Sequence, residues 1–183
     1  MPPAFDEKTW LDIGPCEVTF DGAVLGATVA NPDGGTHGGT RVMLTHEIRD
    51  ALRDARGTKA YDRIFVGQDL RIQTNLTGLA LDQLASIIPG AVLTAGPTKK
   101  AMTLNNPSGT SMRANAGILL LKPITGGVVS ASADDWISIP MAYPDPSFEL
   151  AFSNDDQKVY AVEFSTFENL TSGLVATFGL NTT

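Results

Sequence analysis

Two stretches of alternating polarity, residues 40–48 and 63–74, constrain most strongly what this chain can fold into. They read TRVMLTHEI and RIFVGQDLRIQT. Apolar and polar side chains alternate in both, and a period of two indicates half-buried β-strands, because successive side chains of a strand point to opposite faces of a sheet. The two stretches therefore predict a long hairpin, with its apolar face in the protein core. The side chains expected in that core are Val42, Leu44, Ile48, Ile64, Val66, Leu70 and Ile72.

The connection between these two strands is longer than a hairpin needs. Hairpin loops usually hold about two to five residues, whereas the connection here runs from Arg49 or Asp50 to Asp62 and contains the charged segment DARGTKAYD, residues 54–62. A glycine at position 57 permits a positive φ at the tip of such a loop. The length and the mixed charges together indicate a loop with a purpose beyond joining two strands.

The rest of the chain consists mostly of short apolar segments separated by turn formers. Asp21-Gly22 is a two-residue hairpin signal, and the 18 glycines and 11 prolines point to many turns. The segments 31–39 and 94–116 are expected to be a flexible loop and a polar excursion without regular structure. The expected strands are residues 16–20, 23–28, 117–123, 136–140, 147–152, 158–167 and 174–178.

One segment, residues 77–88, has the period of a helix. Its apolar side chains follow the spacing i, i+3, i+4, i+7, with Thr77 as the expected N-cap and Pro89-Gly90 as the stop. The side chains expected to face the core are Leu81, Leu84, Ala85 and Ile88. The chain is therefore predicted to form a single, mainly β domain over residues 1–183, a β-sandwich or barrel with one flanking α-helix.

Composition excludes several classes of protein. The net charge of −7 disfavours binding to a nucleic-acid backbone, which requires lysine and arginine to neutralise phosphates. The only cysteine, Cys16, leaves no partner for an internal disulfide and cannot build a thiolate zinc site. No window approaches the roughly 20 apolar residues of a membrane span, and the start MPPAFDEKTW does not resemble a signal peptide. A soluble protein made in a reducing cytoplasm is expected.

No motif indicates catalysis. The glycines of GGTHGGT (34–40) lack the lysine and the following helix of a phosphate loop. His37 and His46 match no metal-ligand spacing. The pairs Asp134-Asp135 and Asp155-Asp156 lie in turn-like contexts, where aspartate caps the backbone. No serine stands in a G-x-S-x-G elbow, so no enzyme activity, cofactor or metal is expected.

The sequence also resembles a known protein family, and this resemblance suggests a function. The stretches LDIGPCEVTFDGAVLG (11–26), DARGTKAYDRIFVGQDLRIQTNL (54–76) and LALDQLASIIPGA (79–91) resemble the major tail tube proteins of long-tailed bacteriophages. GILLLKP, WISIPMAYP and FELAFSNDDQKVYAVEFSTF are similar to the later strands of that family, so the resemblance covers most of residues 11–178. The matching positions are Gly14, Cys16, Val18, Phe20, Asp21, Gly22, Leu25, Gly26, Asp54, Gly57, Asp62, Gly67, Ile72, Leu81, Leu84, Ala85, Ile88, Pro89 and Gly90.

The resemblance implies a structural role. Tail tube proteins share a β-sandwich-like barrel with a flanking helix, and they stack as hexameric rings into a hollow tube through which the genome passes without specific binding. The expected location is the virion tail, assembled in the host cytoplasm, with tape-measure, tail-tip and tail-terminator proteins as partners. The loop is then an assembly loop with contacts through Asp54, Arg56, Gly57, Lys59, Tyr61 and Asp62. The polar face of the hairpin is then the lumen wall, formed by Arg41, Thr45, Glu47, Asp69, Arg71 and Gln73.

Three alternatives remain at this stage. The tube protein of a bacterial contractile injection machine shares the ring-forming fold. A β-sandwich binding or adhesion module predicts an exposed aromatic patch, although aromatic residues make up only 7 % of the chain. A small hydrolase requires His37 or His46 to meet a nucleophile.

Overall fold

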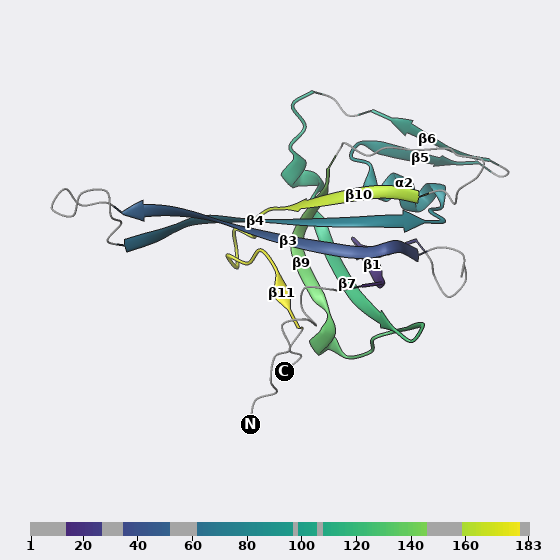
Figure 1. Ribbon diagram of the computed structural model, residues 1–183. Coiled ribbons are helices and arrows are strands. Elements are labelled where there is room, and N and C mark those ends of the chain that lie inside the picture. The colour runs from purple at the N-terminus through teal and green to yellow at the C-terminus, as the bar shows by residue number, and fades with distance from the viewer. Residues whose placement is uncertain are drawn as a thin grey trace.

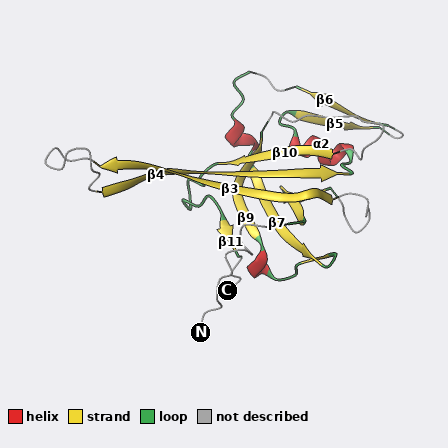
Figure 2. Ribbon diagram, in the orientation of Figure 1, coloured by secondary structure: helices red, strands yellow, loops and turns green. Residues whose placement is uncertain are grey.

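A computed structural model describes residues 14–26, 35–51, 62–96, 99–105, 108–145 and 159–179. The described chain is mainly β, built on a nine-stranded antiparallel sheet with one flanking α-helix (Figures 1 and 2). The predicted fold class is thus confirmed. Its elements are β1 (Cys16–Phe20), β2 (Ala23–Leu25), β3 (Gly35–Ala51), β4 (Asp62–Thr77), α2 (Leu81–Ile87), β5 (Ala91–Ala95), β6 (Lys100–Leu104), β7 (Gly117–Thr125), β8 (Val128–Val129), β9 (Ile137–Pro144), β10 (Val159–Thr166) and β11 (Thr177–Phe178).

The main sheet curls so that its distant strands meet. The strands follow the order β2-β1-β7-β9-β10-β4-β3, while β11 pairs with β9 and β8 with β7. The backbone N–H of Thr40 on β3 donates to the carbonyl of Gly14, just before β1, at 3.1 Å. This contact brings β3 back to the start of the sheet and encloses one face as the core.

The core is apolar and draws on every long strand of the main sheet. The rings of Phe20 on β1 and Phe164 on β10 pack with their centroids 5.3 Å apart. A polar chain crosses the same region, since the Cys16 thiol donates to the Thr40 hydroxyl, which is hydrogen-bonded to that of Thr74, both at 3.0 Å. The largest fully buried side chains include Val18, Leu25, Leu70, Ile72, Leu76, Leu119, Leu121 and Ile139.

The turn between β1 and β2 agrees with its sequence signal. Asp21 and Gly22 both have positive φ angles, 47° and 82°, as the two central residues of a type I′ hairpin turn require. The register confirms a tight hairpin, because Phe20 pairs with Ala23.

The helix is shorter than predicted and begins later. Thr77 is not its N-cap, because β4 continues through Thr77, which pairs with Val159 of β10. The side chain of Gln83 instead accepts a hydrogen bond from the N–H of Ala80 at 2.9 Å and donates to the carbonyl of Val24 at 2.7 Å. Gln83 therefore both caps the helix and ties it to β2.

Only one of the four helix side chains predicted to face the core is buried. This is Leu84, which is joined by Ile87, whereas Leu81, Ala85 and Ile88 are half-buried. Ile88 follows the last helical residue and has an extended conformation. The helical spacing therefore does not determine where its side chain points. Gly90 with a φ of 74° ends the segment, as the Pro89-Gly90 signal indicated.

Two segments predicted to lack regular structure contain strands. Residues 35–39 are the start of β3, where the register shifts between Thr36 and Thr40 and Gly38 and Gly39 have positive φ angles. Lys100–Leu104 forms β6, which pairs with β5 in a separate two-stranded sheet, so residues 94–116 do leave the main sheet. In both segments the glycine-rich or polar composition gave no indication of the extended backbone that the structure shows. The remainder of the loop at 31–39, its residues 31–34, and the strand expected at 147–152 lie outside the described residues.

Within the described part of the chain, none of the helices has the length and apolarity needed to cross a membrane.

Candidate functional site

The β3–β4 hairpin extends well beyond the barrel (Figure 1). β10 pairs with β4 only from Arg71 to Thr77, and β3 has β4 as its only strand partner among the described residues. Residues 43–51 of β3 and 62–69 of β4, called the arm below, are therefore a two-stranded ribbon with both outer edges unpaired. Unpaired edges offer backbone N–H and C=O groups to another chain.

A β-bulge in the arm changes which side chains share a face. Glu47 pairs with Gly67 and Ile48 with Phe65, so Val66 is an extra residue without a direct partner. Beyond it, Ile64 lies opposite Arg49, on the polar face rather than the apolar one. The prediction that Ile64 shares a face with Leu70 is therefore wrong, because one inserted residue shifts the alternation.

The apolar face of the hairpin continues past the barrel, where no residue that the structure describes covers it. At the base, Ile72 and Leu70 are buried and Val42 packs against the core, as predicted. Farther out, the same face carries Leu44, Ile48 and Phe65, which are 50 %, 56 % and 57 % exposed. These three side chains are called the apolar stripe below. The prediction that Leu44 and Ile48 lie in the core is wrong, and Ile64 and Val66 are exposed as well.

His46 lies within this stripe. Its ring contacts that of Phe65 edge-on, with the centroids 5.7 Å apart, and it pairs with Gln68 across the hairpin. This histidine therefore belongs to an aromatic contact on the surface of the arm. The side chain of His37 lies outside the described residues.

The six side chains predicted to form the polar face do share one face. Arg41 lies opposite Gln73, Thr45 opposite Asp69, and Glu47 one pair farther out. Arg71 lies on the same face, opposite Met43. All six are exposed, so the structure brings them together as the alternation predicted.

Glu163 of β10 extends this polar face. It pairs with Gln73, whose amide donates to the Glu163 carboxylate at 3.3 Å. The guanidinium of Arg71 lies 2.9 Å from Asp69 and 3.6 Å from Glu163. The hydrogen bond and charge of Asp69, followed by the charges of Glu163 and Asp145, raise the pKa of Arg71 above its ordinary value. Sequence reasoning missed Glu163 because its neighbour in the sheet is 90 residues away.

The polar face is hollowed near the base of the hairpin. The hollow has a volume of about 540 Å³, and the small residues Gly38, Gly39 and Ala161 leave it open. Arg41 and Glu163 supply opposite charges at its wall. The predicted lumen face is therefore concave and polar at this point.

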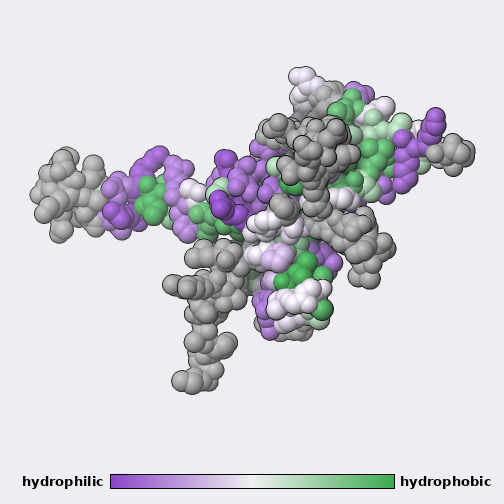
Figure 3. All heavy atoms as spheres, turned by 45° about the vertical axis from the view of Figure 1, so that its right-hand side comes forward, coloured by the Kyte–Doolittle hydropathy of each residue, from purple (hydrophilic) through white to green (hydrophobic). Residues whose placement is uncertain are grey.

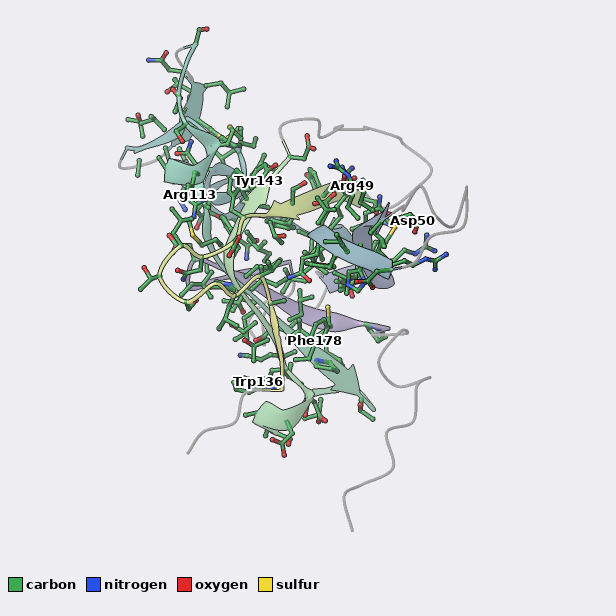
Figure 4. The ribbon with its side chains drawn as sticks, turned by 90° about the vertical axis from the view of Figure 1, so that its left-hand side faces the viewer. Arg49, Asp50, Arg113, Trp136, Tyr143 and Phe178 are labelled. Carbon is green, nitrogen blue, oxygen red and sulfur yellow. The ribbon has the colours of Figure 1, made fainter. Side chains whose placement is uncertain are left out.

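The far end of the arm carries paired charges. Arg63 Nε lies 3.2 Å from the carboxylate of Asp50, and Figure 4 shows Asp50 beside Arg49. Asp62, one of the predicted assembly contacts, is exposed at the start of β4 opposite Ala51. The other predicted contacts lie outside the described residues: Asp54, Arg56, Gly57, Lys59 and Tyr61.

The first aspartate pair has a structural environment. Asp134 and Asp135 belong to a short 3₁₀ helix, Ala133–Asp135, and the Asp135 carboxylate accepts a hydrogen bond from the Ser130 hydroxyl at 2.7 Å. Asp155 and Asp156 lie outside the described residues. Among the side chains that the structure describes, no three of His, Cys, Asp and Glu are arranged to hold a metal ion.

Comparison of the chain with models of known protein families finds no match, and comparison with curated proteins finds none either.

Proposed function

We propose that this protein is the structural subunit of a phage tail tube, which assembles with copies of itself into stacked rings around a hollow lumen. The single observation that carries the proposal is the apolar stripe. The core face of the hairpin continues onto an arm whose apolar side chains stay exposed among the described residues. The resemblance to tail tube proteins, which covers most of residues 11–178, supports a phage tail tube as that assembly.

Energetics support a partner for the stripe. Full burial of one large apolar side chain is worth roughly 1.5–3 kcal/mol. Leu44, Ile48 and Phe65 are each about half exposed, so burying the rest of these three side chains would add several kcal/mol of stabilising free energy that the monomer lacks. A second copy that covers the stripe recovers this free energy once per subunit. Repetition around a ring multiplies it.

The polar face fits a wall past which DNA slides. With Glu163 and Arg49 included, the three carboxylates of this face (Glu47, Asp69 and Glu163) equal its three guanidinium groups (Arg41, Arg49 and Arg71). The face offers neither a cluster of cations nor stacked aromatic rings, which single-stranded nucleic-acid channels use. Each subunit carries a net charge of −7, so an assembly of subunits repels phosphates over roughly a Debye length of about 8–10 Å.

The proposal includes the assembly that the resemblance implies. The subunit forms hexameric rings in the virion tail, with tape-measure, tail-tip and tail-terminator proteins as partners. It performs no catalysis. The tube of a bacterial contractile injection machine would use the same arm, and the neighbouring genes of the two systems distinguish them.

Negative-stain electron microscopy of the concentrated protein tests the proposal. The intact chain is expected to form rings or hollow tubes, and deletion of residues 52–61 is expected to abolish them while circular dichroism shows an unchanged β-fold. Tubes that survive the deletion would keep the function and remove the role of the loop. An intact chain that stays monomeric, even when seeded with tail tips, would contradict the tube and favour a binding module.

A further inference from the structure

We infer that the outer face of the β5–β6 hairpin receives the arm of a second copy of this chain. This inference rests on the proposed self-assembly and assigns the surface that the arm contacts. The outer face is defined by four exposed, uncharged side chains on one side of the small sheet: Val92, Thr94, Ala101 and Thr103.

One side of the β5–β6 hairpin is covered in its middle, and the other side is exposed along its length. Leu93 and Met102 pair across the two strands and are half-buried, and α2 lies against this hairpin. The opposite side presents Val92, which is 56 % exposed, next to Thr103. Val92 is the apolar side chain of this face, and covering it with a partner is favourable because apolar surface leaves water.

The edges of this hairpin are also unpaired. Among the described residues, β5 and β6 pair only with each other. The arm has the same property, since its two outer edges have no strand partner beyond Leu70. Two ribbons of this kind can satisfy one another through backbone hydrogen bonds as well as through side-chain packing.

The charges of the two ribbons are complementary. The described residues of the β5–β6 hairpin include Lys99 and Lys100 and no carboxylate. Lys100 lies on the side opposite the outer face and is paired with Asp82 of α2 at 3.2 Å, so Lys99 is the positive charge left to meet the arm. The arm carries more carboxylates than guanidinium groups. Its acidic residues are Glu47, Asp50, Asp62 and Asp69, and its arginines are Arg49 and Arg63. Opposite net charges favour the arm–hairpin pairing over a pairing of two arms, because like charges that meet at an interface are costly.

The positions of the two ribbons determine the kind of assembly. The arm and the β5–β6 hairpin point away from the barrel in opposite directions (Figure 1), and a view turned by 45° shows apolar side chains on both (Figure 3). One chain therefore cannot dock its own arm on its own hairpin. Contacts between two different surfaces of identical subunits are head-to-tail, and they produce closed rings or open stacks.

Two complementary variants of the full-length chain test the inference. Phe65→Glu damages the arm and leaves the β5–β6 face intact, whereas Val92→Glu damages the face and leaves the arm intact. Each is expected to raise the concentration needed for assembly by at least about tenfold. Ile118→Glu is the matched control, because Ile118 is equally exposed on β7 and belongs to neither surface.

Mixing the two variants gives the decisive result. The intact arm of the Val92→Glu chain docks on the intact face of the Phe65→Glu chain. Neither the remaining arm nor the remaining face of this pair can bind another subunit. Sedimentation velocity is therefore expected to show a species with twice the mass of each variant alone, and no larger species. If Val92→Glu assembles like the control while Phe65→Glu does not, the inference fails and the proposed function stands. A mixture that gives only the sum of its components also overturns the inference.

A variant near the turn of the β5–β6 hairpin tests the inference if Val92→Glu fails to fold. Lys99→Glu changes an exposed residue beside the turn of the hairpin and removes the lysine charge that is not paired with Asp82. It is expected to raise the assembly threshold several-fold at low salt, and the difference from the intact chain is expected to shrink as salt screens the charges. An unchanged threshold at low salt would contradict the inference, and an intact chain that never assembles would remove both this inference and the proposed function.

Discussion

Ile48 of β3 lies directly opposite Phe65 of β4 on the exposed arm, although uninterrupted alternation would place Val66 there. The extra residue at position 66 moves Phe65 to the apolar face, where its ring also meets His46. Bulges increase the local twist of a hairpin and bend it. The bulge thus sets both the composition of the apolar stripe and the direction of the arm.

Deleting Val66 is expected to leave the fold intact and impair assembly. The free energy of unfolding should change by less than about 0.5 kcal/mol, because Val66 is exposed and contributes nothing to the core. Assembly should weaken, because the deletion removes the bend and twist that aim the arm. Urea unfolding and sedimentation velocity on the same samples check both parts. A large loss of stability would show instead that the bulge is needed for folding.

Two isoleucines of one strand are expected to respond very differently to truncation. Ile72 is fully buried whereas Ile64 is 55 % exposed. Ile72→Ala should lower the free energy of unfolding by about 2–5 kcal/mol, the usual cost of emptying a core position. Ile64→Ala should lower it by about 0.5 kcal/mol or less. Urea denaturation measures both, and similar losses for the two variants would contradict the uncovered arm.

The hairpin shows which features the sequence could predict and which it could not. Alternation correctly predicted the strands and the polar face, because side-chain direction is a local property of an extended chain. Whether a face is covered depends on how far the barrel reaches, and no local pattern contains that information. Leu44 and Ile48 therefore read as core residues although they are exposed. The bulge was hidden as well, because Phe65 and Val66 are both apolar.

Other misses share this cause. Thr77 matches the N-cap preference, but pairing with β10 holds it in β4. Glu163 joins the polar face through a neighbour 90 residues distant, which no spacing rule connects. In contrast, the turn at Asp21-Gly22 and the stop at Gly90 were predictable, since positive φ angles depend on the residue itself.

Gln83 is expected to stabilise the chain more than its polar, partly exposed position suggests. Its side chain accepts from Ala80 and donates to Val24, so it joins the helix to β2. Gln83→Ala should lower the free energy of unfolding by about 1–2 kcal/mol, because both hydrogen bonds are lost. Gln73→Ala, on the exposed polar face, is the matched control with little expected effect. Equal losses in the two variants would remove the role assigned to Gln83.

Cys16 is expected to make stability fall at alkaline pH. Burial, as the largest cause, raises the pKa of its thiol from 9.0 to about 11. Between these values the unfolded chain loses the proton while the folded chain keeps it. The contribution is therefore complete below pH 9 and is lost as the pH rises toward 11, by about 2 kcal/mol in total.

The effect of this thiol can be separated from those of tyrosine and lysine, which titrate in the same range. The difference in unfolding free energy between the intact chain and Cys16→Ala should shrink by about 2 kcal/mol from pH 8 to pH 11. A thiol reagent should label Cys16 at pH 8 only after denaturation, because the folded thiol is buried and protonated. Rapid labelling of the folded chain, or a difference that does not vary with pH, would show that Cys16 is accessible to water.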